Sequence, residues 1–229
     1  MLLCKWEELP DDMRNNAVKP YFDILKSKSG SLVCKRIFDV IVAGIMLVVL
    51  FPVFVIIAVA IKIDSKGPVF FRQTRITQYG KSFRIHKFRS MTVNAEREGQ
   101  ITVKDDIRVT RVGKIIRRYR LDEISQLLDI LQGTMTFVGV RPEVPKYVAH
   151  YTDEMKATLL LPAGVTNRTS IYYADEAKLI ETAEDRDKVY IETILPQKMK
   201  FNLEEIKKFS FWSDIEEMFL TVYSICKNK

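Results

Sequence analysis

Residues 40–60 read VIVAGIMLVVLFPVFVIIAVA, a run of 21 residues without a charged or polar side chain. A helix rises about 1.5 Å per residue, so this run would reach roughly 30 Å, the thickness of the hydrocarbon core of a bilayer. The sequence therefore predicts one membrane helix. Pro52 lies within the run, and because proline lacks the N–H that an inner helical position donates, we expect the helix to kink there.

Lysine and arginine are equally common on both sides of this run. Seven of them occur in residues 1–36 and six in residues 62–84. The positive-inside rule therefore gives no preferred orientation for a spanning helix. A re-entrant helix, which returns to the side it entered, would keep both basic flanks in the cytoplasm. A plain spanning helix is the alternative.

Length, charge and cysteine use restrict the class of protein. The chain has 229 residues, which leaves room for one moderate domain besides the membrane helix. Its formal net charge of +7 predicts an anionic partner. Beside a membrane helix, phospholipid head groups or a phosphorylated substrate are favoured over nucleic acid. The 3 cysteines have no CxxC spacing and indicate reduced thiols in a protein that faces the cytosol.

Periodicity predicts the remaining elements. Alternation in residues 65–75 and 79–91 predicts a β-hairpin with basic residues on it, joined at Tyr79 and Gly80. Apolar spacing predicts a helix over 113–132 that Gly133 caps, and charged helical sequence covers 173–209. The tail, 211–227, is amphipathic, and it either packs into the core or lies on the bilayer.

The strongest candidate for chemistry is a pair of acids, Asp122 and Glu123, that follows a basic segment. If a helix restarts at Asp122, the positive end of its dipole should lower the pKa of this carboxyl group and keep it ionised. An ionised carboxylate among guanidinium groups can attack a phosphorus atom whose charge they partly neutralise, and the neighbouring acid can hold Mg²⁺. A salt-bridged helix without catalytic function is the alternative. The basic residues are Lys114, Arg117, Arg118 and Arg120.

Two further basic sets could bind phosphate. Arg141 lies on a turn stiffened by Pro142, and a guanidinium fixed in this way can bind phosphate bidentately with little side-chain freedom to lose. Lys87 and Arg89 lie on the second basic strand, where they face either substrate or lipid head groups.

These residues belong to motifs that resemble the bacterial sugar transferases, also called monotopic phosphoglycosyl transferases or polyprenyl-phosphate hexose-1-phosphate transferases. The resemblance runs from Lys35 to about Cys226. Its motifs occur in the same order as in the family, and together they are highly specific. The motifs are KRIFDVI at 35–41, KGPVFFRQTR at 66–75, KFRSM at 87–91, RRYRLDEISQLLDIL at 117–131, GTMTFVGVRPEVP at 133–145 and LPAGVT at 161–166.

The resemblance implies an α/β fold that is mostly helical with a small β-hairpin. It implies a monotopic membrane protein with one re-entrant helix, broken at Pro52, and with interfacial amphipathic helices. The implied division is an N-terminal extension over 1–33, the re-entrant helix over 34–64 and a catalytic domain over 65–229. This domain would lie on the cytoplasmic face of the bacterial inner membrane.

The resemblance also implies a two-step reaction. Asp122 would attack the β-phosphate of a UDP-sugar and release UMP, and the covalent phosphosugar would then pass to polyprenyl phosphate, the first membrane step of glycan synthesis. Both acids are implied ligands of Mg²⁺. The implied phosphate- and nucleotide-binding residues are Arg117, Arg141, Lys87, Arg89, Lys114 and Gln126. The expected partners are the UDP-sugar, polyprenyl phosphate and phospholipids, with no nucleic acid, and a homodimer is compatible with the large apolar surface.

The chain departs from the family pattern at a few positions. Phe51-Pro52 stands where the family usually has Ser-Pro, Thr134 replaces an acid, and Asp129 stands where asparagine is common. None of these changes removes the pair of acids. Two other functions remain open on the sequence: a membrane-anchored basic scaffold that binds anionic lipid, and a UDP-sugar hydrolase in which water is the acceptor.

Overall fold

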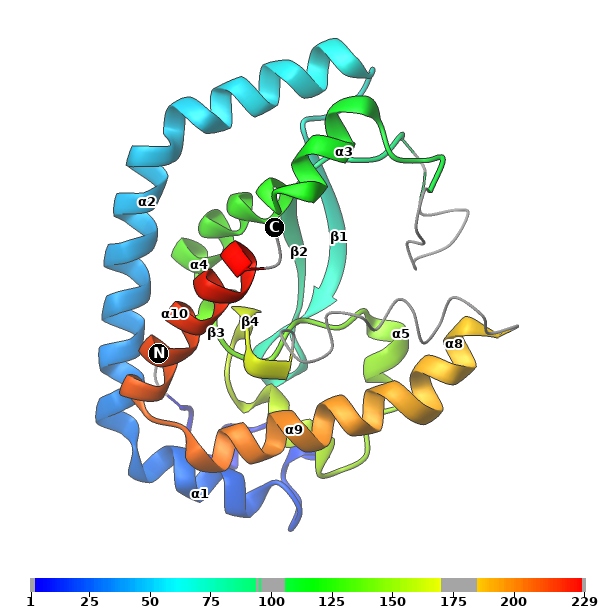
Figure 1. Cartoon of the computed structure of the whole chain (residues 1–229). Coiled ribbons are helices and arrows are strands. Elements are labelled where there is room, and N and C mark those ends of the chain that lie inside the picture. Colours follow the sequence, from blue (N-terminus) through cyan, green and yellow to red (C-terminus); the bar gives the residue numbers. More distant parts are fainter. Residues whose placement is uncertain (1–2, 94, 96–105, 170–184, 228–229) are drawn as a thin grey trace.

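The computed structural model describes residues 3–93, 95, 106–169 and 185–227 (Figure 1). Its elements confirm a mostly helical protein with a small amount of sheet. In chain order they are η1 (Trp6–Glu8), η2 (Asp11–Met13), α1 (Lys19–Ser27), α2 (Ser29–Asp64), β1 (Phe70–Ile76), η3 (Gln78–Gly80), β2 (Ser82–Phe88), α3 (Arg111–Arg118), η5 (Leu121–Gln126), α4 (Leu127–Gln132), β3 (Met135–Val138), α5 (Pro145–Val148), η6 (Met155–Leu160), β4 (Ala163–Thr166), α8 (Arg186–Val189), η7 (Tyr190–Ile194), α9 (Leu195–Lys208) and α10 (Phe211–Lys227).

The apolar run forms the middle of α2, a helix of 36 residues that contains Pro52. Figure 1 shows α2 bending between its blue and cyan limbs, so that the helix frames the rest of the chain on two sides. By length and composition it is able to cross a membrane, and only 11% of its apolar window is buried inside the protein. Helix α2 is therefore much more exposed than the core helix of a soluble domain.

Both limbs of α2 pack against the same domain. Ala43 in the first limb joins a core cluster with Ile130 and Met135, next to α4 and β3. In the second limb, Ile57 and Ile61 pack with Phe88 of β2 and Ile116 of α3. The concave side of the bent helix is thus part of the core, while its convex side carries the exposed apolar residues. These include Ile45, Val48, Val49, Phe51, Ile56 and Val59.

Polar contacts fix the beginning of α2 to the domain. Asp39 is 1% exposed and accepts hydrogen bonds from Thr136 Oγ1 at 2.6 Å and from the Phe137 main-chain N–H at 3.3 Å. The buried ammonium group of Lys35 donates to the Val138 carbonyl at 2.7 Å and pairs with Asp214 of α10. The first turns of α2 are therefore held to β3 and α10.

The predicted β-hairpin is confirmed. Strands β1 and β2 pair antiparallel, with Arg72 opposite His86 and Phe71 opposite Lys87. A second pair, β3 and β4, is parallel and was not predicted from the sequence. In that pair a Cβ on Gly164 would lie 2.1 Å from the Gly139 carbonyl oxygen, so only glycine permits this close approach.

The single helix predicted over 113–132 is wrong. Helix α3 ends at Arg118, and Arg120 adopts a left-handed conformation with φ of 53°, which no α-helix can continue through. The chain then forms the 3-10 helix η5 and the short helix α4. The predicted cap at Gly133 is confirmed, because Gly133 has φ of 85° and ends α4.

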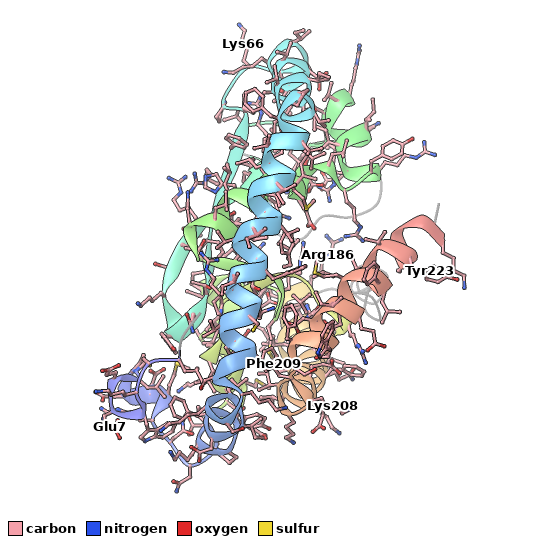
Figure 2. All side chains as sticks on the ribbon, turned by 90° about the vertical axis from the view of Figure 1, so that its left-hand side faces the viewer. Glu7, Lys66, Arg186, Lys208, Phe209 and Tyr223 are labelled. Carbon is pink, nitrogen blue, oxygen red and sulfur yellow. The ribbon has the colours of Figure 1, made fainter. Side chains whose placement is uncertain are left out.

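The two ends of the chain differ in how they pack. No linker separates the first two α-helices, since α1 ends at Ser27 and α2 begins at Ser29. Elements η1 to α1 bury Phe22 and Leu25 against η6 and α9. Helix α10 instead leaves Trp212 77% exposed and Phe219 73% exposed. Figure 2 faces α2 and shows α10 beside its first limb, diverging toward Tyr223.

Candidate active site

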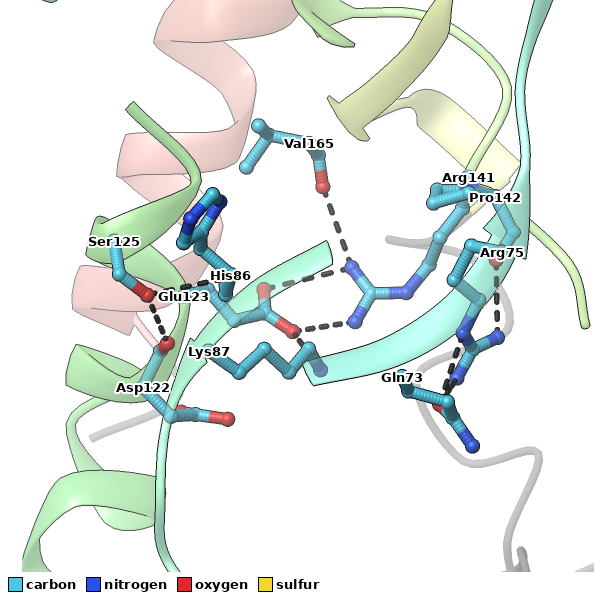
Figure 3. Close-up of polar contacts among 10 residues, drawn as sticks. All are labelled: Gln73, Arg75, His86, Lys87, Asp122, Glu123, Ser125, Arg141, Pro142 and Val165. Carbon is cyan, nitrogen blue, oxygen red and sulfur yellow. Dashed lines mark hydrogen bonds and ion pairs between the residues drawn. The ribbon is translucent and has the colours of Figure 1, made fainter. Parts of the chain in front are cut away.

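The pair of acids lies in the first turn of η5, which begins directly after the left-handed Arg120. Strand β2 brings Lys87 to η5, and the segment that follows β3 brings Arg141 from the other side (Figure 3). The structure thus gathers one acid pair and two cations from three separate parts of the chain.

Glu123 is the centre of this cluster. Its Oε1 pairs with Arg141 Nη2, its Oε2 lies 3.4 Å from Arg141 Nη1, and Lys87 Nζ donates to Oε1 at 3.2 Å. Burial alone would raise the pKa of Glu123, but the charges of Arg141 and Lys87 more than offset it and hold this pKa well below its usual range. Burial lowers the pKa of Lys87, and the Glu123 charge opposes that effect. Glu123 is therefore an ionised anchor for two cations.

Asp122 has a different environment. Burial raises its pKa above the usual range, the charges of Lys87 and Arg117 lower it, and the Glu123 charge raises it further. The expected lowering by a helix dipole is therefore wrong, because a short 3-10 helix begins here and burial is the largest effect. Among the described residues no other side chain is hydrogen bonded to the Asp122 carboxylate, which Figure 3 shows free of dashed contacts. This carboxylate is available to a substrate.

The other predicted residues lie at different depths around the pair. Arg117 is half-buried at the end of α3, and its charge acts on Asp122. Lys114 is exposed one turn earlier. Gln126 is 1% exposed, and neither polar atom of its side chain has a hydrogen-bond partner within the described part of the chain.

Arg89 does not join the cluster. It is 5% exposed, and its guanidinium group donates to the main-chain carbonyls of Ser65 at 2.8 Å and Lys66 at 2.6 Å, beyond the end of α2. These bonds hold the segment that leaves α2 against the end of β2. The hydrogen bonds of Arg89 in the described part of the chain are thus with Ser65 and Lys66 and not with the acids.

The sequence did not single out Arg75 and Gln73 for a role. Arg75 Nη1 donates to the Pro142 carbonyl at 3.0 Å, and its Nε donates to Gln73 Oε1 at 3.0 Å. Arg75 therefore steadies the turn that carries Arg141, as Figure 3 shows. The alternation of the hairpin was the available signal, since Gln73 and Arg75 are two residues apart and thus on the same face of β1.

The donor set is compatible with Mg²⁺ in one arrangement. Among the described residues there is no group of three or more histidine, cysteine or acidic side chains that could hold a metal ion. Magnesium in phosphotransfer sites, however, is usually bound by one or two carboxylates together with substrate phosphates. Asp122 offers an uncommitted carboxylate for this purpose, whereas Glu123 is bound to Arg141 and Lys87.

Comparison with known proteins identifies the family. The family model described as "Bacterial sugar transferase" matches residues 30–228, and the chain belongs to this family. It is 36% identical to a UDP-glucose:undecaprenyl-phosphate glucose-1-phosphate transferase of Klebsiella pneumoniae. The aligned region of 226 residues covers 96% of this chain and 45% of that protein.

Two further relatives are named for a different sugar. An N-acetylgalactosaminephosphotransferase of Aeromonas hydrophila, named for UDP-N-acetylgalactosamine and undecaprenyl phosphate, is 34% identical over 195 residues, or 83% of this chain and 43% of that protein. A putative undecaprenyl-phosphate N-acetylgalactosaminyl 1-phosphate transferase of Bacillus subtilis is 36% identical over 135 residues, or 58% of this chain and 75% of that protein. The chain spans about half the length of the first relatives it matches.

Proposed function

We propose that this chain transfers a sugar-1-phosphate from a UDP-sugar to polyprenyl phosphate and releases UMP. The observation that carries the proposal is the Asp122 carboxylate, half-buried beside Lys87 and Arg117 and bound by no other described side chain. The names of the relatives support the same donor and acceptor classes. The reaction would begin a glycan on the cytoplasmic face of the bacterial inner membrane.

In the first step a carboxylate oxygen of Asp122 bonds to the β-phosphorus of the UDP-sugar. The bond from this phosphorus to the bridging oxygen breaks, and UMP leaves with that oxygen and its electron pair. In the second step an oxygen of polyprenyl phosphate attacks the same phosphorus atom. The bond to Asp122 breaks, the carboxylate is restored, and the product is a polyprenyl-diphosphate sugar.

The cations around Asp122 bind and orient the diphosphate. Arg141 can present a planar donor pair to phosphate oxygens, while Lys87 and Arg117 offset the charge of the attacking carboxylate. Glu123 holds Arg141 and Lys87 in place through its two oxygens. The Asp122 carboxylate would hold Mg²⁺, which would supply additional neutralisation of the diphosphate charge.

The membrane arrangement follows from α2. We propose that α2 is re-entrant, because both of its limbs pack against one domain and the helix contains Pro52. A straight spanning helix would place the two limbs in different environments. A topology reporter fused before residue 1 should therefore remain cytoplasmic, and a periplasmic reporter would support the plain spanning helix instead.

The decisive experiment measures UMP release from a panel of UDP-sugars, with Mg²⁺ and with or without polyprenyl phosphate. Asp122→Asn should abolish turnover while the protein still inserts in membranes, because the amide is a poor nucleophile. Transfer retained in this variant would rule out the covalent role of Asp122. Multiple turnovers without the lipid would instead support the hydrolase, and lipid binding without UMP release would support the scaffold.

A further inference from the structure

The outer edge of β2 is bound to η5 and α4 by two side chains. The main-chain N–H of His86 donates to Asp129 Oδ2 at 2.8 Å, and the His86 carbonyl accepts from Ser125 Oγ at 3.0 Å. Both groups point away from β1, since alternate residues of an antiparallel strand direct their main-chain groups to opposite edges. We call His86, Asp129 and Ser125 the edge clamp.

The imidazole ring adds a third bond to the edge clamp. His86 Nδ1 lies 2.7 Å from Asp129 Oδ1, and His86 Nε2 lies 2.5 Å from Arg72 Nη1. A guanidinium group only donates, so Nε2 accepts and the ring proton is on Nδ1, where it is donated to Asp129. Asp129 thus accepts two hydrogen bonds from His86 while only 1% exposed. Without it, two donors would be left unpaired in a buried place.

The edge clamp lies next to the candidate active site in sequence and in space. Lys87 follows His86 directly, and Ser125 is two residues beyond Glu123. The Ser125 hydroxyl also lies 3.2 Å from the Asp122 carbonyl, which Figure 3 shows beside the cluster of charges. Sliding β2 along η5 would therefore break the edge clamp and the 3.2 Å contact between Lys87 and Glu123 together.

We propose that Asp129, His86 and Ser125 are positioning residues for the transfer reaction. They fix β2 against η5, so that Lys87 is held between Glu123 and the Asp122 carboxylate. The expected effect on the rate of transfer rests on the proposed function. Displacements of about 1 Å in a reacting group can cost on the order of a hundredfold in rate, so such a clamp has a kinetic effect without touching substrate.

The first test compares two buried aspartates that make equivalent contacts. Asp129→Ala should lower kcat for UMP release by on the order of tenfold to a hundredfold with little change in KM. Asp39→Ala is the matched control, because Asp39 is also 1% exposed and also accepts one side-chain and one main-chain hydrogen bond. It should lower thermal stability similarly and leave kcat nearly unchanged. A kcat loss in Asp129→Ala no larger than in Asp39→Ala overturns the proposal.

Two further variants test the mechanism. Asp129→Asn retains one oxygen for the His86 main-chain N–H but leaves the Nδ1 proton without an acceptor, so it should recover part of the lost kcat. In a Lys87→Met background, Asp129→Ala should have little additional effect, because the residue it positions is gone. Additive losses in this double-mutant cycle, or no recovery by asparagine, overturn the proposal. Ser125→Ala supplies a smaller perturbation if Asp129→Ala does not fold, with an expected loss of about threefold, in line with one neutral hydrogen bond.

Hydrogen exchange separates this inference from the proposed function. Peptides that cover residues 82–91 should exchange faster in Asp129→Ala and in Ser125→Ala than in the wild type, and should be unchanged in Asp39→Ala. This readout needs no turnover. If exchange is faster in the clamp variants but the wild type releases no UMP, the proposed function is refuted and the edge clamp is kept. Unchanged exchange in both clamp variants would overturn the edge clamp itself.

Discussion

Lys87 interacts with both acids of the candidate site. It donates to Glu123 at 3.2 Å, and its positive charge lowers the pKa of Asp122, which burial raises. The proposed nucleophile is the Asp122 carboxylate, so activity should fall as the pH drops through the pKa of this group. The acid limb of the pH profile therefore reports the electrostatic environment of this one group.

Two substitutions should move this limb in opposite directions. Lys87→Met removes a charge that lowers the pKa of Asp122, so the acid limb of kcat/KM should move to higher pH. Glu123→Gln removes a charge that raises the same pKa, so the limb should move to lower pH. Both variants should also lose rate. If the acid limb moves in the same direction in both variants, Asp122 is not the titrating group.

At the scale of elements, the bend in α2 decides the geometry of the molecule. Proline removes one helical N–H and disfavours a straight path, and packing of both limbs on the domain reinforces the bend. Pro52→Ala should restore the N–H and allow part of the population to straighten. We expect lower activity in membranes, and a reporter at residue 1 that becomes partly periplasmic.

Val55→Ala is the control for this prediction. Val55 is 46% exposed on the same helix, and its replacement removes apolar surface without adding a main-chain N–H. Its topology and activity should match the wild type. If Pro52→Ala also matches the wild type, then packing alone fixes the bend and the proline is dispensable.

Elements with strong local signals were predictable from the sequence, and those fixed by distant contacts were not. The apolar run of α2, the alternation of the hairpin and the Gly133 cap each have a local cause. The break at Arg120 has none, because arginine rarely adopts φ of 53° and only the surrounding fold imposes it. The strands β3 and β4 are four residues each and pair across the chain, which periodicity cannot detect.

The candidate site shows the same division. Asp122, Glu123 and Arg141 were predicted from charge pattern and family resemblance, and the structure brings them together with Lys87. The raised pKa of Asp122 depends on burial, which the sequence does not encode locally. The contacts of His86 with Asp129 join positions 43 residues apart, so only the fold reveals them.

At the scale of the whole molecule, α10 extends the apolar surface that α2 begins. Trp212 is 77% exposed, and tryptophan is enriched at the interface between lipid and water. The protein has 2 tryptophans, and the other, Trp6, packs on Phe22. We expect brominated lipids to quench the fluorescence of Trp212 in a Trp6→Phe variant.

The reciprocal variant is the control for this measurement. In Trp212→Phe the remaining Trp6 should show little quenching, because it packs against α1, away from α10. Bromine near the head groups should quench Trp212 more strongly than bromine near the bilayer centre, as expected for a helix that lies in the interface. Equal quenching of both tryptophans would exclude this orientation of α10.

The packing of one domain on both limbs of α2 has a consequence for biogenesis. Helix α2 is synthesised before the partners of its concave side, which include Phe88, Ile116 and Ile130. We therefore expect α2 to enter lipid before that side has protein to contact, and the domain to complete its core by folding back onto a helix already in the membrane. We expect residues 65–229 made alone to be insoluble, and an anchor supplied separately to rescue them only when it reproduces both limbs.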